Sequence, residues 1–187
     1  MAKTVYSCAT TLDGFIADPN DGIDWLEGYE GTFDGEGARP LEGGYDSFYE
    51  RIGALVMGSV TYEFVLREAS AWPYSGKPSW ILTTRELPKM AGAEEDIRFS
   101  SASVRELYSE LVAAAGQRDV WVVGGGNIAS QFADAGLLDE VTLAVVPVVL
   151  GAGKPLFDRG LPGGKMQLLA AHPLDNGMIH VSYAVGG

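Results

Sequence analysis

The sequence has few of the residues that most often bind metals or form disulfides. It contains one cysteine, Cys8, and two histidines, His172 and His180, in 187 residues. A single cysteine excludes an intrachain disulfide, and the β-favouring run around Cys8 is typical of a buried thiol. So few nitrogen and sulfur ligands argue against a metal site and against a histidine-dependent catalytic triad. The zinc deaminase signature, H-x-E followed by P-C-x-x-C, is also absent.

Long apolar runs and clusters of basic residues are missing as well. No stretch approaches the roughly 18 apolar residues that a membrane-spanning helix needs, and the first ten residues lack the features of a signal peptide. The net charge is −12, whereas nucleic-acid binding depends on clustered Lys and Arg. We therefore expect a soluble, cytoplasmic protein with no nucleic-acid or membrane partner. Any phosphate site in it must use backbone amides and one or two cations.

Strand-like and helix-like segments alternate along most of the chain. The expected strands are residues 5–10, 54–58, 79–84, 120–124 and 141–150, and the expected helices are residues 46–52, 60–67, 103–115 and 127–135. This alternation predicts a three-layer α/β fold with a mostly parallel sheet. Residues 165–174 and 178–185 flank an Asn-Gly pair, which favours a hairpin, so the sheet should be mixed, with antiparallel C-terminal strands. We expect a single domain over residues 1–187.

Glycine is abundant and concentrates at two strand-to-helix junctions. The stretch VWVVGGGNIA, residues 120–129, places three consecutive glycines between an apolar strand and a helix, and residues 54–64, ALVMGSVTYEF, hold a second such turn. Glycines allow an anion to approach the unpaired amides at a helix N-terminus. Tight packing of strand against helix is the alternative reason for each turn. The match of the first turn to the Rossmann fingerprint is weak, because no acidic residue ends the following strand.

Five motifs, in order, resemble those of the dihydrofolate reductase superfamily. They are TTLDGFIA (10–17), MGSVTYE (57–63), TTR (83–85), VVGGGNIASQFADAGLLDEVTL (122–143) and PVVLGAGKPLF (147–157). Within that superfamily the chain is most similar to the C-terminal reductase domain of the bifunctional riboflavin-biosynthesis deaminase-reductase, as a stand-alone member. The resemblance implies a dihydrofolate-reductase-like fold that binds NADPH across the carboxyl edge of the sheet. It also implies a cis peptide bond between the first two glycines, Gly124 and Gly125.

The same resemblance implies the cofactor-binding residues. These are Ala9, Ile16, Gly22, Gly58, Ser59, Thr61, Thr84, Arg85, Gly124, Gly125, Gly126, Asn127 and Ile128. The triple glycine would lie under the diphosphate, and Arg85 would face the adenosine 2′-phosphate. Relatives usually have an arginine where this chain has Ser59, which removes one charge-assisted contact to that phosphate. NADPH is therefore the expected cofactor, with NADH possible.

The catalytic and substrate-binding residues are less clearly marked. The helix region offers Glu42, Asp46 and Glu50 as candidate acids, and Asp46 is preferred because it begins a helix and could face the cleft, although aspartate is also a preferred N-cap. Asp13 lies in a turn where it more often bonds its own backbone. Trp25 and Trp72 are candidate walls of the substrate cleft, and plain packing is the alternative for both. The glycine-rich residues 27–45 are expected to form a long surface loop.

The expected function is an NADPH-dependent reductase. It would transfer hydride to a small heterocyclic substrate, pterin-like or pyrimidine-like, or to a carbonyl substrate. The alternative is a nucleotide- or flavin-binding protein of the same fold without catalytic activity. A homodimer is also expected, with the apolar run at residues 141–150 contributing to its interface.

Overall fold

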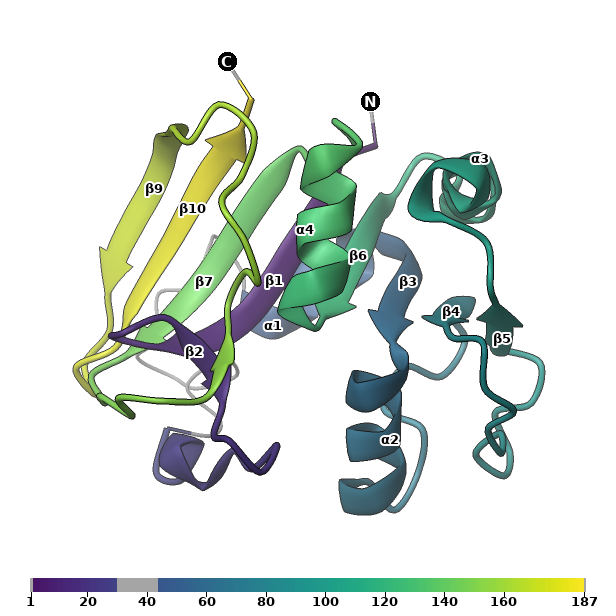
Figure 1. Cartoon of the computed structure of the whole chain (residues 1–187), viewed down its shortest axis with the longest axis horizontal. Coiled ribbons are helices and arrows are strands. Elements are labelled where there is room, and N and C mark those ends of the chain that lie inside the picture. Colours follow the sequence, from purple (N-terminus) through teal and green to yellow (C-terminus); the bar gives the residue numbers. More distant parts are fainter. Residues whose placement is uncertain (1, 30–43, 187) are drawn as a thin grey trace.

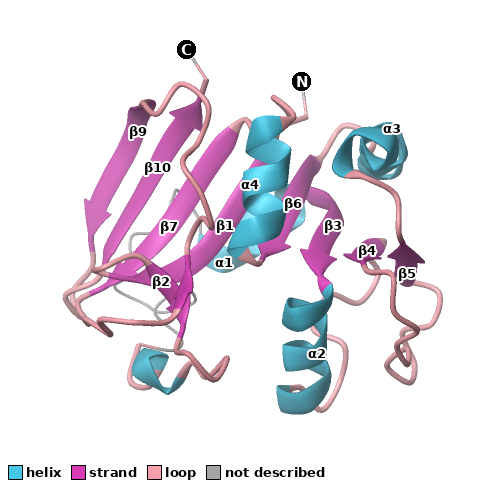
Figure 2. Cartoon of the chain, in the orientation of Figure 1, coloured by secondary structure: helices cyan, strands magenta, loops and turns pink. Residues whose placement is uncertain are grey.

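An eight-stranded mixed sheet forms the centre of the protein. The computed structural model describes residues 2–29 and 44–186. Its elements are β1 (Thr4–Thr11), β2 (Phe15–Ala17), a 3₁₀ turn (Asp24–Leu26), α1 (Gly44–Arg51), β3 (Ile52–Gly58), α2 (Ser59–Glu68), β4 (Ser79–Leu82), β5 (Ile97–Ser100), α3 (Val104–Ala115), β6 (Asp119–Gly124), α4 (Gly126–Asp134), β7 (Glu140–Val146), β8 (Lys154–Pro155), β9 (Met166–Pro173) and β10 (Ile179–Val185) (Figure 2). The strand order is β5-β4-β3-β6-β1-β7-β10-β9.

The sheet is parallel over six strands and antiparallel over the last two. Strands β5, β4, β3, β6, β1 and β7 all pair in parallel. Strand β10 pairs antiparallel with both β7 and β9. The predicted mixed sheet with antiparallel C-terminal strands is therefore confirmed.

Helices cover both faces of the sheet, which makes the fold three-layered. In Figure 1, α3 and α4 lie in front of the sheet and α1 lies behind it. The central strands are almost continuously apolar, as strands covered on both faces must be. None of the helices within the described ranges is long and apolar enough to cross a membrane.

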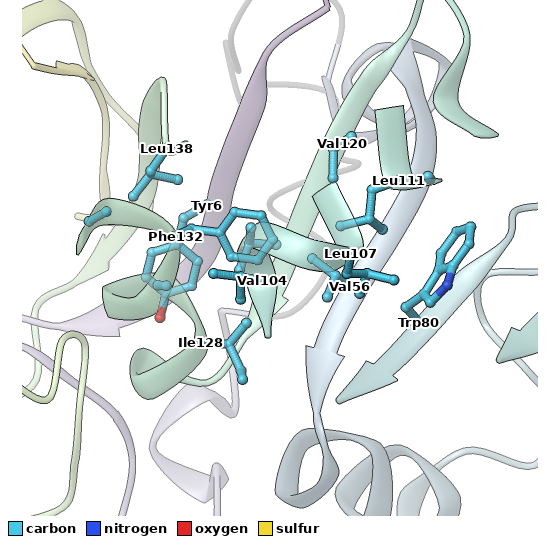
Figure 3. Close-up of a cluster of buried hydrophobic side chains, with 14 of the residues drawn as sticks. Tyr6, Val56, Trp80, Val104, Leu107, Leu111, Val120, Ile128, Phe132 and Leu138 are labelled. Carbon is cyan, nitrogen blue, oxygen red and sulfur yellow. The ribbon is translucent and has the colours of Figure 1, made fainter. Parts of the chain in front are cut away.

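The largest buried cluster fixes α3 and α4 on the sheet (Figure 3). From α4 it includes Ile128 and Phe132, from α3 Leu107 and Leu111, and from the sheet Tyr6 among others. Phe132 and Leu111 are fully buried. This packing determines where the N-terminus of α4, and with it the triple-glycine turn, meets the sheet.

Some elements differ from the sequence expectation. The strand expected at residues 141–150 ends at Val146, and the proline that follows has no N–H to continue a ladder. The small sheet of β2 and β8 was not predicted, because strands of two or three residues carry too little periodicity, and β5 was missed as well. Most of the loop predicted at residues 27–45 lies outside the described residues.

The C-terminal hairpin contains a buried histidine that should make stability depend on pH. His180 is 8% exposed, lies across from His172, and has a buried Nδ1 without a hydrogen-bond partner among the residues that the structure describes. Burial, and then the neighbouring His172, lower the pKa of His180. As the pH falls below about 6.5, His180 therefore takes up a proton more readily in the unfolded chain than in the folded one. The free energy of unfolding consequently decreases in that range.

We expect His180→Gln to reduce this acid sensitivity. The measurement is the difference in melting temperature between about pH 7.5 and about pH 5.5, on either side of the histidine pKa. The variant should show a smaller difference than the wild type, and His172→Gln, which removes the neighbour that lowers the pKa of His180, should show an intermediate one. An unchanged difference in His180→Gln would mean that other groups cause the acid sensitivity.

Candidate active site

A cavity of about 770 Å³ opens at the carboxyl ends of the parallel strands. Five strands of the main sheet contribute to its wall: β1 through Cys8 and Ala9, β3 through Gly58, β4 through Leu82, β5 through Ser100 and β6 through Val123 and Gly124. The small sheet of β2 and β8 also contributes to it. Ligands of open α/β sheets bind outside this edge, because the strand-to-helix turns gather there. The volume is within the range of sites for small molecules and cofactors, roughly 300 to 1,000 Å³.

The triple-glycine turn forms one part of the wall. Strand β6 ends at Gly124, and α4 begins at Gly126 without a side-chain cap. The peptide bond between Gly124 and Gly125 is cis, as the resemblance implied, and Gly124 has a φ of 148°. A side chain at Gly126 would overlap the carbonyl oxygens of Pro155 and Leu156. The backbone that comes close to Gly126 is thus that of the protein's own strand β8.

The second glycine turn lies directly beside the first. Helix α2 begins after Gly58, again without a side-chain cap or an acidic residue in its first turn. A Cβ at Gly58 would lie 3.2 Å from the Ile128 side chain, and Thr61 Oγ1 lies 3.5 Å from the position of a Cβ at Gly124. Two helix N-termini with unpaired amides therefore face one cavity, and this arrangement attracts anions.

The charged groups of the cavity wall are few. Among the described residues that line it, the charged side chains are Asp21, Lys154 and Asp158. Lys154 Nζ lies 3.5 Å from Asp21 Oδ1. Asp158 accepts a hydrogen bond from Asn127 Nδ2, which holds the pKa of this carboxyl below its usual range. Within the described ranges, no group of three or more His, Cys, Asp or Glu side chains is arranged to hold a metal ion.

Cys8 lies, partly buried, in the wall of this cavity. It is a free cysteine on β1. Burial raises the pKa of its thiol to about 12. The thiol therefore stays protonated at neutral pH, and only the thiolate is a strong nucleophile. The sequence predicted a buried thiol, whereas Cys8 is half-buried.

The structure brings most of the predicted cofactor-binding residues to this one cavity. The predicted residues that line it are Ala9, Ile16, Gly58, Ser59, Thr61, Thr84, Gly124, Gly125, Gly126, Asn127 and Ile128. Gly22 does not line the cavity, although both of its neighbours do. Its amide donates to Asp18 Oδ1 at 2.8 Å, so it shapes the turn after β2.

Arg85 also stays outside the cavity wall, although it directly follows Thr84, which is part of it. Its guanidinium donates two hydrogen bonds to the carboxylate of Glu63, at 2.9 and 2.6 Å. Glu63 lies on α2, one helical turn after Ser59. An incoming phosphate would therefore have to share Arg85 with an existing carboxylate partner.

The two tryptophans predicted to border the substrate have different positions. Trp25 lines the cavity. Trp72 is 6% exposed and packs edge-on against the rings of Tyr62 and Tyr74, in the core beneath α2. The aromatic residues that reach the cavity are Trp25, Phe64 and Tyr74. Sequence reasoning missed Phe64 and Tyr74, because nothing in the local pattern shows which ring of an aromatic cluster faces a cavity.

Asp46, the candidate catalytic acid, is not brought to the cavity. It lies exposed in the first turn of α1, on the other side of the sheet from α4 (Figure 1). The acids that do line the cavity, Asp21 and Asp158, were not identified in the sequence. Both lie in irregular segments, where spacing gives no signal. Asp13 accepts hydrogen bonds from Thr11 Oγ1 and from the amides of Leu150 and Gly151, so it joins its turn to a distant loop, whereas bonding to the backbone of its own turn was expected.

Fold and cavity together define the class of protein. A mixed sheet of this order, with a glycine-shaped cavity at its carboxyl edge, is the dihydrofolate-reductase-like fold. The dihydrofolate reductase from Enterococcus faecalis, solved in complex with NADP(H), has this fold, with 14% identity and a TM-score of 0.62 over 99% of this chain and 97% of that one. A crystal structure from Shewanella sp. PV-4, of a protein assigned provisionally to riboflavin biosynthesis, is 26% identical, with a TM-score of 0.80 over the full length of both chains.

The family model of the RibD C-terminal domain matches residues 65–180, and the chain belongs to that family. It is also 33% identical over 166 residues to the uncharacterized protein YwjB from Bacillus subtilis, covering 89% of this chain and 88% of that protein. The resemblance found in the sequence motifs is thereby confirmed at the level of family and fold.

Proposed function

We propose that this protein is an NADPH-dependent reductase of a small heterocyclic substrate, pterin-like or pyrimidine-like, or of a carbonyl substrate. The observation that carries the proposal is the pair of uncapped, glycine-opened helix N-termini at one cavity on the carboxyl edge of the sheet. The NADP(H) complex of the E. faecalis enzyme, which has the same fold, supports the choice of cofactor.

The residues of the cavity suit such a cofactor in two different ways. The amides of Gly125, Gly126 and Asn127 would hold the diphosphate, because they open a helix without a side-chain cap. Ala9 and Ile16 give an apolar wall that would exclude water from the nicotinamide. When bound, NADPH supplies the hydride.

Calorimetric titration with NADPH, and separately with NADH, tests the cofactor proposal. We expect micromolar binding of NADPH. If it binds, the disappearance of NADPH absorbance should then be followed with dihydropterin, dihydrofolate, ribosylaminopyrimidine and simple carbonyl compounds. Failure of both cofactors to bind at millimolar concentration would reject the reductase.

A second candidate function is a nucleotide- or flavin-binding protein without turnover. It is favoured by the position of Asp46 on an exposed helix away from the cavity. Ser59 also favours this alternative, because relatives have at this position an arginine that contacts the 2′-phosphate. Steady-state turnover with any of the substrates above would exclude this alternative. Tight flavin binding without NADPH oxidation would favour it over the reductase.

We expect Ser59→Arg to tighten NADPH binding and leave NADH binding unchanged. Ser59 lines the cavity at the start of α2, and Glu63 already holds Arg85. A new arginine would supply a second cation to the 2′-phosphate. One charge-assisted hydrogen bond contributes about 1.5–3 kcal/mol, or roughly tenfold or more in affinity. Titrations of Ser59→Arg and the control Ser59→Ala measure this, and equal tightening of both cofactors would show that Ser59 is not near the 2′-phosphate.

We also propose that two copies pair through strand β9. The run at residues 141–150, expected at the interface, lies largely in β7, whose two edges are occupied by β1 and β10. Strand β9 is an edge of the sheet, and it exposes Met166, Leu168 and Leu169. Edge strands with exposed apolar side chains pair readily with other chains. Sedimentation at micromolar concentration should show a dimer that Leu168→Lys dissociates; a wild-type monomer would reject the pairing.

A further inference from the structure

The cavity is poor in positive charge for a site that would bind a multiply charged anion. The chain carries a net charge of −12. Of the charged side chains in the described part of the cavity wall, Asp21 and Asp158 are acidic and Lys154 is basic. Backbone amides at the two helix N-termini supply partial charges only. If an anion binds between these carboxylates, Lys154 is the full positive charge available to it within the described wall.

The backbone of Lys154 is held on both sides by close contacts to glycine. Strand β8 pairs with β2, where Lys154 lies opposite Ala17. A side chain at Gly153 would overlap the carbonyl of Ala17, and one at Gly126 would overlap the carbonyl of Pro155. Strand β8 is therefore clamped between β2 and the first residue of α4. This clamp places Lys154 next to the triple-glycine turn.

The side chain of Lys154, by contrast, is held weakly. Its partner Asp21 lies 3.5 Å away, and the two side chains are 46% and 36% exposed. Exposed ion pairs of this kind contribute little free energy, with a median of about 0–1 kcal/mol. An anion in the cavity can therefore replace Asp21 as the partner of the ammonium group at little cost in free energy.

From this geometry we propose that Lys154 binds the diphosphate of the cofactor, and that Asp21 holds the lysine when no anion is bound. This inference rests on the proposed function. Lys154 lies in the motif at residues 147–157, but it is not among the cofactor-binding residues that the resemblance implied. Because NADPH and NADH carry the same diphosphate, Lys154 should contribute equally to the binding of both, unlike a residue at the 2′-phosphate.

The test is the affinity of Lys154→Met for NADPH and NADH by calorimetry. We expect both dissociation constants to rise about tenfold, as for loss of one charge-assisted contact at a partly exposed site. Their ratio should stay constant, and both affinities should become less sensitive to added KCl. Lys154→Arg should retain most of the binding. Lys165→Met, an exposed lysine outside the cavity wall, is the matched control and should bind as the wild type does.

Asp21→Asn gives an independent measurement that does not depend on how Lys154→Met folds. Removing the competing carboxylate should tighten both cofactors about twofold to threefold, because the exposed pair is weak. If Lys154→Met weakens NADPH alone, the lysine meets the 2′-phosphate and the inference is wrong. Unchanged binding of both cofactors would also overturn it, while leaving the proposed function intact. A wild-type protein that binds neither cofactor would instead reject the proposed function and this inference together.

Discussion

Gly125→Ala should weaken NADPH and NADH binding about tenfold without unfolding the protein, whereas Gly126→Ala should destabilise the fold itself. The two neighbouring glycines face different surroundings. A Cβ at Gly125 would be 3.7 Å from Ile16 Cδ1 and 3.8 Å from Thr61 Oγ1, which are ordinary contacts. It would stand at the cavity wall, where the proposed diphosphate approaches the amides. A Cβ at Gly126 would overlap the backbone oxygens of Pro155, in β8, and of Leu156, which directly follows it, and these cannot move without shifting the strand.

Two measurements separate these effects. Denaturant unfolding should show a loss of about 1–3 kcal/mol for Gly126→Ala, as for other overpacked interiors, and a much smaller loss for Gly125→Ala. Calorimetry on the folded fraction should then show the binding defect of Gly125→Ala. A Gly126→Ala variant as stable as the wild type would mean that β8 is not packed on α4 as described. Wild-type affinity in Gly125→Ala would mean that the cofactor does not approach this turn.

Phe132→Ala should cause the largest loss of stability among simple truncations in α4. Phe132 is fully buried in the cluster between α4 and the sheet (Figure 3). Truncating a buried phenylalanine typically costs about 3–5 kcal/mol, because burial is lost and a cavity remains. Since α4 carries the triple-glycine turn at its start, loosening the helix should also weaken cofactor binding.

Urea unfolding of Phe132→Ala, followed by circular dichroism, measures this loss. The matched control is Val60→Ala, an apolar residue that is 56% exposed on the first turn of α2. It should change stability by less than about 0.5 kcal/mol. A loss below about 1 kcal/mol for Phe132→Ala would show that the core relaxes around the missing ring.

Local sequence signals predicted those parts of the site that depend on backbone conformation. The glycine turns at residues 58 and 124–126 stand between an apolar run and a helix, and two of these glycines are required by the structure: Gly124 has a φ of 148°, and a Cβ at Gly126 would overlap backbone atoms. They were recognised from the sequence, and the structure places both in one cavity. The order of strands and helices followed from periodicity in the same way. The shortest strands, β2 and β8, were not predicted, because two or three residues do not establish a period.

The sequence by itself therefore determined the fold family, the element order and the backbone of the candidate site, because these are encoded in runs of adjacent residues. Only the tertiary structure decided which side chains reach the cavity. It placed Lys154, Asp21 and Trp25 in the wall and left Trp72 in the core and Asp46 on an exposed helix. These positions depend on contacts between segments far apart in the chain, such as β8 against α4, and no local pattern records them.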